Sequence, residues 1–488
     1  MDRPNILIFM TDHQRADTVL PEHPCLTPNL DGFARQAVTF TNTFCPSPHC
    51  CPSRATFMTG MYPSRHGVWN NICNESRLSR GLASGVRCWS EDLAAAGYRL
   101  VWTGKWHVSI DERPADRGWE ERTVTATGAE LHGQTWDHFR RLAAESEPTE
   151  RAEGQILRPG YGPYTIYANT GDEGNRHDER VVSEAVEAIG ELGRSDRPWA
   201  LFAGAIGPHD PYYVPGKYLD MYDPDSVPLP PSYADDLSDK PRIYQRMRRT
   251  RFGQLSEREV RETIRHFWAY CTYLDDLFGR LLAALEATGR AENTLVLYCS
   301  DHGDYCGEHG LFAKGIPCFR GAYHVPAVIR WPAGLASPSR REGAFLSLAD
   351  FAPTFVELAG GQQSLSRDPK GSAGQSLVPF LRGTRPHDWR DEIHTQCSGI
   401  EMYYTQRSVM TADWKYVFNG FDFDELYDLR RDPHEMTNLA DRAEFEPVKR
   451  DLCRRLWRFA CREGDEKATN AYITVGLAPY GPAEAFRE

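Results

Sequence analysis

Short apolar runs alternate along the chain with longer segments whose apolar residues recur at helical spacing. The runs are too short for buried helices, and they predict strands that are covered on both faces of a sheet. The alternation therefore predicts an α/β domain with a large mixed, mostly parallel sheet sandwiched by helices. The predicted strands are residues 5–10, 37–40, 98–102, 198–206, 294–299 and 325–331, and the predicted helices are residues 52–58, 90–97, 178–192, 257–287 and 348–358.

The pattern changes near residue 389, where strand-like runs become shorter and lie closer together. Short strands separated by turns are typical of an antiparallel sheet. We expect a main α/β domain over residues 1–388 and a smaller C-terminal α+β subdomain, with a helix and a tail, over residues 389–488. The C-terminal strands are predicted at residues 392–396, 402–410, 414–418 and 425–429, and the helix at residues 447–463.

Polar side chains follow two of the predicted strands directly. Asp12 and His13 follow the first strand, and Asp301 and His302 follow the strand at residues 294–299. Ligands bind at the carboxyl ends of strands in open α/β sheets, so these residues are candidates for one shared site. Alternatively, Asp12 caps a helix and His13 is a surface histidine, and neither residue belongs to a site.

Two other strand ends also carry candidate residues. Lys105 and His107 follow the strand at residues 98–102 and stand two positions apart, so on an extended segment they would project to the same face. His209 follows the strand at residues 198–206 and lies between two prolines, in a stiff loop. A solvated lysine and ordinary structural histidines are the alternative.

Residues 50–60 form the most informative stretch of the sequence. Pro52 suits the first turn of a helix, because its fixed φ and missing N–H cost nothing there, and Gly60 suits the helix end. Cys50 then stands at a helix N-terminus, where free N–H groups and the helix dipole favour an anion. Arg54 adds a positive charge one turn later. The alternative is a small buried cysteine.

Composition limits the function classes. The chain has 488 residues and a net charge of −12, and this acidic balance argues against nucleic acid as the main partner. The 13 cysteines are odd in number and irregularly spaced, so a disulfide framework is not expected. No apolar run has the length of a membrane span, and no signal peptide is recognisable, so we expect a cytoplasmic protein without a membrane partner.

The motifs together resemble the type I sulfatases of the alkaline phosphatase superfamily. The resemblance is carried by Cys-Cys-Pro-Ser-Arg at residues 50–54, Gly-Lys-Trp-His at residues 104–107, and Ser-Asp-His-Gly-Asp at residues 300–304 with Lys314 beyond it. It implies an alkaline-phosphatase-like catalytic domain. It also implies that a formylglycine-generating enzyme oxidises Cys50 to formylglycine, whose geminal diol attacks an ester and later expels the bound anion.

The resemblance also implies a metal site and further catalytic residues. The metal ligands would be Asp12, His13, Asp301 and His302, although His13 departs from the usual Asp or Gln. Calcium is the usual metal of the family, and the two histidines make manganese plausible. The implied catalytic residues are Cys50, Arg54 and Lys105 for the nucleophile and the sulfate charge, His107 for release of sulfate, and His209 and Lys314 for the leaving group.

The sequence therefore predicts a sulfuric ester hydrolase that cleaves the S–O bond of a small organic sulfate monoester. A phosphonate monoester or phosphodiester hydrolase of the same superfamily is the alternative, and a catalytically idle binding protein is a third possibility. The apolar tail at residues 472–480 predicts either a homo-oligomer or packing on its own subunit. Candidate pocket walls are Trp69, Asn70, Asn71, Tyr161, Tyr164, Tyr167, Tyr212, Tyr213 and Arg320.

Overall fold

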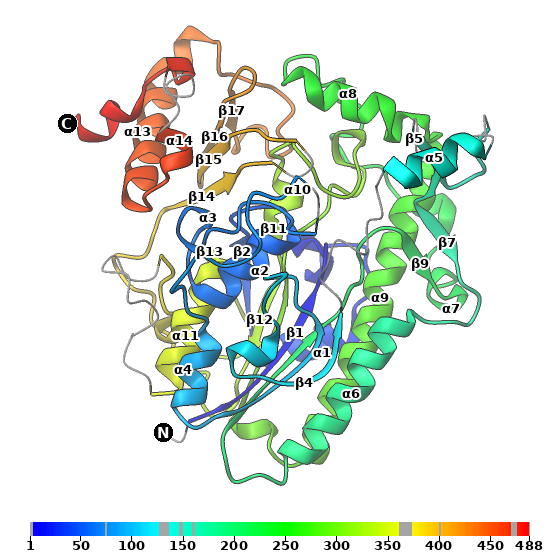
Figure 1. Cartoon of the computed structure of the whole chain (residues 1–488), viewed down its shortest axis with the longest axis vertical. Coiled ribbons are helices and arrows are strands. Elements are labelled where there is room, and N and C mark those ends of the chain that lie inside the picture. The colour runs from blue at the N-terminus through cyan, green and yellow to red at the C-terminus, as the bar shows by residue number, and fades with distance from the viewer. Residues whose placement is uncertain are drawn as a thin grey trace.

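The computed structural model of the chain describes residues 3–73, 76–125, 136–145, 150–158, 162–360, 373–399, 402–469 and 476–487. Within these residues, the largest sheet has nine strands and forms the centre of the molecule (Figure 1). β11 and β12 run antiparallel to their neighbours and the other strands run parallel, which confirms the predicted mixed, mostly parallel sheet. The strands in spatial order are β11 (His324–Val325), β2 (Val38–Phe44), β12 (Ala327–Arg330), β10 (Thr294–Ser300), β1 (Asn5–Thr11), β8 (Trp199–Gly204), β3 (Arg99–Lys105) and β4 (Glu120–Thr125), and β13 (Arg340–Ser347) pairs with β2.

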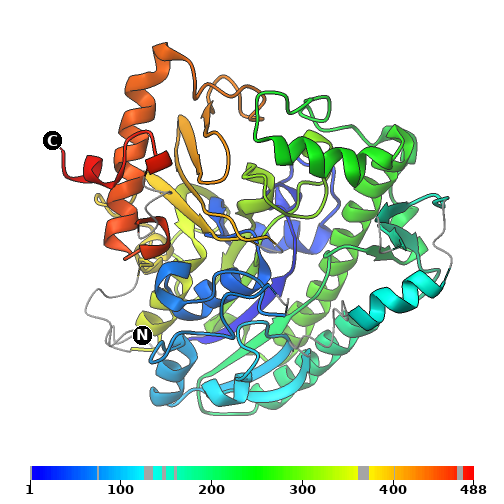
Figure 2. The same ribbon diagram turned by 45° about the horizontal axis from the view of Figure 1, so that its top comes forward.

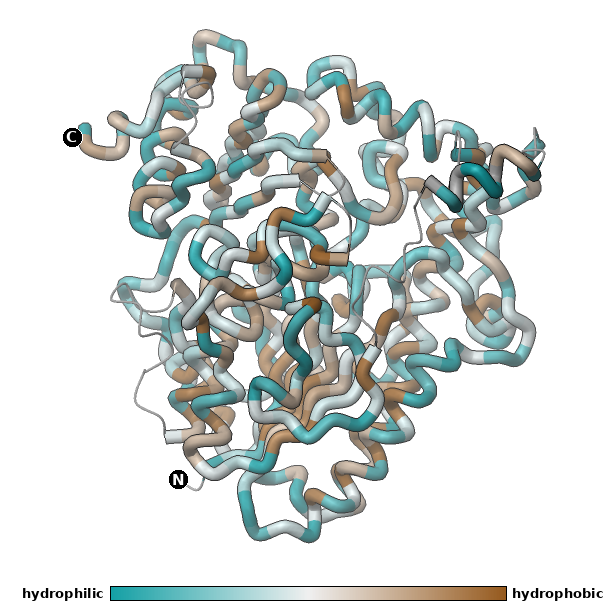
Figure 3. The backbone as a smooth tube through the Cα atoms, in the orientation of Figure 1, coloured by the Kyte–Doolittle hydropathy of each residue, from teal (hydrophilic) through white to brown (hydrophobic). Residues whose placement is uncertain are grey.

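Helices cover both faces of this sheet, as Figure 1 shows. α6 and α9 pack together on one face, and α4 and α11 pack together on the other. Every residue of β1 and β10 is buried, as expected for strands covered on both sides. Figure 3 shows hydrophobic residues concentrated in these central strands. The covering helices are α1 (Pro28–Ala34), α2 (Cys50–Thr59), α4 (Trp89–Ala95), α6 (Arg176–Leu192), α9 (Glu257–Ala287) and α11 (Phe351–Leu358).

Shorter elements fill the segments between these. The two-stranded sheets are β5 (Gln155–Arg158) with β6 (Gly162–Thr165), and β7 (Tyr167–Asn169) with β9 (Tyr212–Val214). The short helices are α3 (Pro63–His66), α5 (Trp136–Ala144), α7 (Gly216–Leu219), α8 (Arg242–Thr250), α10 (Arg320–Tyr323), α12 (Val378–Leu381) and α14 (Glu466–Thr469).

The C-terminal part of the chain forms a separate antiparallel sheet, as predicted. Its strands are β14 (Glu392–Cys397), β15 (Gln406–Thr411), β16 (Trp414–Asn419) and β17 (Glu425–Asp428). α13 (Glu446–Arg462) packs against β15 and β16, and Figure 2 shows this helix beside the C-terminal sheet. The packing closes a second apolar core that includes Trp457.

Several predicted elements differ from the structure. The single strand expected at residues 325–331 is divided at Pro326 into β11 and β12, because proline cannot donate to the ladder. The strand expected from residue 402 begins at Gln406. β4 is an edge strand of the main sheet, although it lies within residues 110–175, whose polar composition predicts an insertion.

The sequence predicts that Asp275 and Asp276 form a polar face of α9, and for Asp275 this prediction is wrong. Asp275 is fully buried, and its carboxylate accepts hydrogen bonds from the backbone N–H groups of Asn29 and Leu30 at the start of α1. The carboxylate thereby satisfies N–H groups that a helix N-terminus leaves without intrahelical partners.

The described part of the C-terminal tail packs on its own subunit. Tyr480 donates a hydrogen bond to Glu446 of α13, and Glu484 pairs with Arg450 and Arg454 of the same helix. These contacts favour the intramolecular alternative for residues 476–487, whereas residues 470–475 lie outside the described residues. In the part of the chain that the structure describes, no helix is both long enough and apolar enough for a membrane crossing.

Candidate active site

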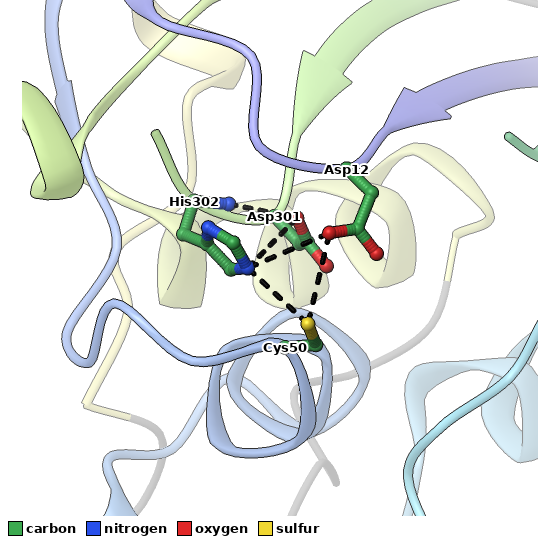
Figure 4. Close-up of side chains that lie close together, drawn as sticks. All are labelled: Asp12, Cys50, Asp301 and His302. Atoms are coloured by element: carbon green, nitrogen blue, oxygen red, sulfur yellow. Dashed lines mark hydrogen bonds and ion pairs between the residues drawn. The ribbon is translucent and has the colours of Figure 1, made fainter. Parts of the chain in front are cut away.

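Two neighbouring strands of the main sheet bring four of the predicted site residues together. β1 and β10 pair in parallel with Thr11 opposite Ser300, so Asp12 and Asp301 leave the sheet side by side. His13 and His302 follow them, and all four residues are fully buried. Figure 4 shows Asp12, Asp301 and His302 gathered around one point.

Cys50 reaches this point from the N-terminus of α2. Its Sγ lies 3.2 Å from His302 Nε2 and 3.6 Å from Asp12 Oδ1 (Figure 4). α2 begins at Cys50, two residues before the predicted start, and ends at Gly60, whose φ of 71° suits a residue without a Cβ. The neighbouring Cys51 is engaged elsewhere: its Sγ accepts a hydrogen bond from Ile72 N at 3.4 Å.

Cations surround the cysteine and the carboxylates. Arg54 donates to Asp301 Oδ2 at 2.7 Å and to Asp12 Oδ2 at 3.3 Å, and Lys105 Nζ also donates to Asp12 Oδ2. Lys314 Nζ donates to Cys50 Sγ at 3.2 Å. Although burial opposes ionisation of the thiol, Lys105, Lys314 and His302 lower the pKa of Cys50 well below its usual value. The site therefore stabilises negative charge at the position of Cys50.

His107 joins the same cluster through a turn. β3 ends at Lys105, and His107 has a left-handed φ of 57°, so the expected extended arrangement of Lys105 and His107 is wrong. His107 nevertheless contributes to lowering the pKa of Cys50, and its Nε2 lies 3.2 Å from Cys73 Sγ.

His209 stands on the more open side of the cluster. Its ring packs on His13 with 4.0 Å between centroids, its Nε2 lies 3.4 Å from Lys314 Nζ, and its side chain is 31% exposed. Burial and Lys314 oppose its charge, but Asp210, Cys50 and Asp12 raise the pKa of His209 above its usual value. The structure thus brings all the predicted site residues into one continuous cluster.

Asp304 is a member of the cluster that the sequence did not reveal. Its Oδ2 lies 3.1 Å from His13 Nδ1 and accepts a hydrogen bond from Tyr212 OH at 2.7 Å, and its Oδ1 accepts one from Cys306 N at 2.8 Å. With Nδ1 held in this way, Nε2 of His13 faces Asp12 and Lys314. A carboxylate on the second ring nitrogen is typical of metal-binding histidines. The sequence signal for this residue is that Asp304 is the second aspartate of Ser-Asp-His-Gly-Asp at residues 300–304.

Most residues predicted to line a substrate pocket make contacts within the fold and do not reach the cluster. Asn71 Oδ1 accepts a hydrogen bond from Cys51 N, and Trp69 lies beneath Arg407 and Lys467. Asn70 bonds within its own loop, and Arg320 Nη2 donates to Asn42.

The tyrosines of the middle segment divide between packing and the site. Tyr167 packs on His266 and Tyr213 is 40% exposed, whereas Tyr164 donates to Asp210 beside His209. Tyr161 lies outside the described residues. Among the described tyrosines, Tyr164 therefore lies beside His209 through Asp210, and Tyr212 bonds Asp304.

The donor atoms of the cluster fit a divalent cation. Within the described residues, one candidate ligand group contains Asp12, Cys50, Asp301 and His302, and another contains Asp12, His13 and His209. Lys314 Nζ contacts His13 Nε2 and lies 3.1 Å from His302 Nε2, so these donors already converge on a positive charge. Carboxylate oxygens suit calcium and manganese, and imidazole suits transition ions.

Comparisons with known proteins agree with this geometry. The sulfatase family model matches residues 4–361, and the model of the N-sulphoglucosamine sulphohydrolase C-terminal region matches residues 307–462. The chain is 31% identical over 460 residues to a choline-sulfatase of Rhizobium meliloti, covering 90% of this chain and 83% of the relative. It is 27% identical over 468 residues to an arylsulfatase of Clostridium perfringens, covering 91% of this chain and 92% of the relative.

A solved structure has the same fold. The phosphonate monoester hydrolase of Agrobacterium radiobacter superposes with a TM-score of 0.76 at 24% identity, covering 94% of this chain and 96% of the other. This likeness shows the fold, whereas the model that matches residues 4–361 is that of the sulfatase family and the two relatives in sequence are sulfatases. The chain belongs to the sulfatase family, and it is an enzyme that hydrolyses sulfate esters.

Proposed function

We propose that this sulfatase cleaves the S–O bond of its substrate through a formylglycine made from Cys50. The observation that supports this most directly is the position of Cys50 Sγ, at the N-terminus of α2 and within 3.2 Å of both Lys314 Nζ and His302 Nε2. A hydrated formylglycine supplies a hydroxyl nucleophile and a second hydroxyl through which sulfate can be expelled. The proposed nucleophile therefore sits where both cations and metal donors converge.

The proposed metal ligands are Asp12, His13, Asp301 and His302. When bound, a divalent ion supplies Lewis-acid chemistry, polarising a sulfate oxygen and lowering the pKa of the attacking hydroxyl. Calcium is the usual metal of the family, but an imidazole fixed by Asp304 favours manganese.

Fixed positive charges hold the sulfate group in this proposal. Arg54 and Lys105 are anchored on Asp12 and Asp301, so their positions are set before substrate binds. Burial opposes the charge of Lys105, but Asp12 and Cys50 raise its pKa, so it remains cationic. Preorganised charges of this kind stabilise negative charge that develops in the transition state.

Proton transfers are assigned to the histidines. His209 and Lys314 stand together on the open side of the cluster, where they can protonate or stabilise the departing oxygen. His107 acts on the charge of Cys50 from another side, and we assign to it the proton that must leave before sulfate is released.

Replacement of His209 by alanine should affect poor leaving groups most. An alkyl alcohol needs a proton to leave and nitrophenol does not, so we expect kcat to fall about 10²-fold or more for an alkyl sulfate and less than about tenfold for nitrophenyl sulfate. The acid is the protonated imidazole, which is present below its raised pKa and lost above it. Wild-type kcat for the alkyl ester should therefore decline as the pH rises above this pKa. Equal losses on both esters would contradict the acid role.

Replacement of Asp304 by asparagine should weaken metal binding. The change removes the charge that fixes His13, and loss of such a partner typically costs 10–100-fold in metal affinity. The measurement is competition for Mn²⁺ with a fluorescent chelator. Asp235→Asn is the matched control, because Asp235 Oδ2 lies 2.7 Å from the ring of His309 outside the cluster. Wild-type affinity in Asp304→Asn would contradict the role of Asp304.

Phosphonate monoester or phosphodiester hydrolysis is the competing activity. The fold is shared with a phosphonate monoester hydrolase. Sulfate and phosphonate esters of the same alcohol provide the test. We expect the higher kcat/KM for the sulfate ester, and the reverse order would assign the chain to the competing activity.

Four further expectations complete the proposal. A formylglycine-generating enzyme matures the chain, and coexpression with one should raise activity. The protein is cytoplasmic, which cell fractionation tests. The boundary between the main α/β domain and the C-terminal subdomain lies between residues 388 and 389. The protein forms a homo-oligomer through its tail, which is tested by measuring the mass in solution of the full chain and of a chain truncated after Thr469.

A further inference from the structure

The loop that carries His209 is anchored by a buried carboxylate from a neighbouring helix. Asp178 lies in the first turn of α6 and is fully buried. Its Oδ1 accepts a hydrogen bond from Ile206 N at 2.7 Å, and its Oδ2 accepts one from Gly207 N at 3.0 Å. A single side chain thereby fixes two successive peptide groups of the loop, close to His209 in sequence.

The same peptide groups connect the loop to the active site. Ile206 O accepts a hydrogen bond from His209 N at 3.1 Å, and Gly207 O accepts one from Asp12 N at 2.9 Å. The peptide between Ile206 and Gly207 therefore donates to Asp178 through its N–H and accepts from His209 through its C=O. A shift of Asp178 would reach His209 through this one peptide group.

The carboxylate of Asp178 is itself held in place by two helices. His177 Nδ1 lies 3.0 Å from Asp178 Oδ1. Tyr270 OH of α9 accepts a hydrogen bond from Asn175 Nδ2 at 2.7 Å and donates to Asp178 Oδ2 at 3.4 Å. α6 and α9 pack together, as Figure 1 shows, so the main helices of this face set the position of the carboxylate.

This position requires a carboxylate rather than another polar side chain. Among the described residues, no lysine or arginine pairs with Asp178, which instead contacts His177. Burial of a carboxylate is costly, and charge-assisted hydrogen bonds from the two backbone N–H groups offset that cost. An amide has only one oxygen, so asparagine would accept from one of these N–H groups and present a donor to the other.

We propose that Asp178 is a positioning residue for the leaving-group step. It fixes the loop so that the His209 imidazole reaches the departing oxygen. A proton donor must lie within hydrogen-bond reach of the atom that it protonates, and a misplacement of about 1 Å can cost about 10²-fold in rate. The inference rests on the proposed function, because it takes His209 as the group that faces the leaving group.

The test is the kcat of Asp178→Asn for two esters that differ in leaving group. We expect kcat to fall about tenfold for an alkyl sulfate and by less than about threefold for nitrophenyl sulfate, which needs no proton donor. Asp12 stays held by Arg54 and Lys105, so the effect on the metal end of the site is small. A loss of folded or matured enzyme would lower both rates equally, so the ratio of the two rates reports placement alone.

Asp275→Asn is the matched control. Asp275 is also fully buried, and its carboxylate also accepts hydrogen bonds from two successive backbone N–H groups, those of Asn29 and Leu30. It holds α1 rather than the loop of His209, so the ratio of the two rates should stay at the wild-type value. An equal loss on both esters in Asp178→Asn would overturn the inference.

Gly207→Ala moves the loop without changing Asp178. A Cβ at Gly207 would lie 2.7 Å from Tyr270 Cζ, so the loop must shift away from α9. We expect the same selective loss on the alkyl ester. A wild-type ratio of the two rates in this variant would also contradict the inference, even if Asp178→Asn did not fold.

A double variant shows whether Asp178 acts through His209. In a His209→Ala background, Asp178→Asn should cause no further selective loss on the alkyl ester, because the group that it positions is absent. A further selective loss would overturn the inference. If His209→Ala alone lowers both rates equally, the acid role in the proposed function is refuted, and this inference is refuted with it.

Nuclear magnetic resonance of histidine-labelled protein tests the placement without turnover. The His209 imidazole signals, assigned by their loss in His209→Ala, should shift in Asp178→Asn and stay unchanged in Asp275→Asn. Shifted signals in a protein that hydrolyses no sulfate ester would support the positioning and refute the proposed function. Unchanged signals in an active Asp178→Asn enzyme would refute the positioning alone.

Discussion

Replacement of Cys50 by alanine is expected to abolish sulfate ester hydrolysis while the protein stays folded. The change removes the side chain from which the proposed nucleophile is made, and the Sγ of that side chain lies 3.2 Å from both Lys314 Nζ and His302 Nε2. Loss of a nucleophile costs a rate factor on the order of 10⁴ or more. The buried backbone of α2 keeps its hydrogen bonds, so we expect the midpoint of thermal unfolding to change by only a few degrees.

Cys51→Ala is the matched control for this prediction. Cys51 is equally buried and adjacent in sequence, but its Sγ contacts Ile72 N rather than the cluster. We expect this variant to retain most of the wild-type kcat. An active Cys50→Ala protein would refute the proposed mechanism, even if Cys51 had then taken over the role of Cys50.

Peptide mass spectrometry extends the same test to the wild type. If Cys50 is matured, the peptide that contains it carries an aldehyde in place of the thiol, whereas Cys51 in the same peptide stays unchanged. Activity should rise in proportion to the converted fraction. An unmodified peptide from a fully active preparation would exclude formylglycine.

The sequence predicted the main sheet and the site because both depend on local patterns. The candidate metal ligands directly follow apolar strands, so their place at the carboxyl edge follows from the strand that precedes them. Asp12 and Asp301 illustrate this, since the pairing of β1 with β10 needs only two buried parallel strands.

Features that depend on contacts between distant segments could not be predicted in this way. The contact of Asp304 with His13 joins the ends of different strands, and the hydrogen bonds from Asn29 and Leu30 to Asp275 join two helices. The left-handed turn at His107 arises after β3 has ended, where strand periodicity no longer applies. Edge strand β4 is only partly buried, so its hydrophobic pattern is weak.

Loss of metal ligands is the second prediction with a large expected effect. Asp301→Asn and His302→Ala should each lower bound metal and kcat together, because both side chains belong to the buried donor group around Cys50. Removal of metal by a chelator should abolish activity, and activity should return when Mn²⁺ or Ca²⁺ is added. Metal content is measured by elemental analysis of the purified variants, and kcat is measured on the same samples.

Stability must be separated from ligation in these variants. Asp301 also holds the buried guanidinium of Arg54 at 2.7 Å, and breaking a buried ion pair can cost about 3–5 kcal/mol. His302 has no such pair with Arg54, so His302→Ala tests ligation with less effect on folding. His309→Ala is the control for loss of a buried histidine, since its ring stacks on Phe319 at 3.6 Å outside the donor group.

His13 decides how far this site departs from the usual ligands of the family. Its Nδ1 is held by Asp304, so its Nε2 has one orientation, toward Asp12 and Lys314. If that nitrogen ligates the ion, His13→Ala should lower metal content and kcat about as much as His302→Ala does. The preference for Mn²⁺ over Ca²⁺ should also shrink, because the variant loses a nitrogen donor that calcium does not favour. Full metal occupancy and a normal rate in His13→Ala would make His13 a structural residue and leave Asp12, Asp301 and His302 as the proposed ligands.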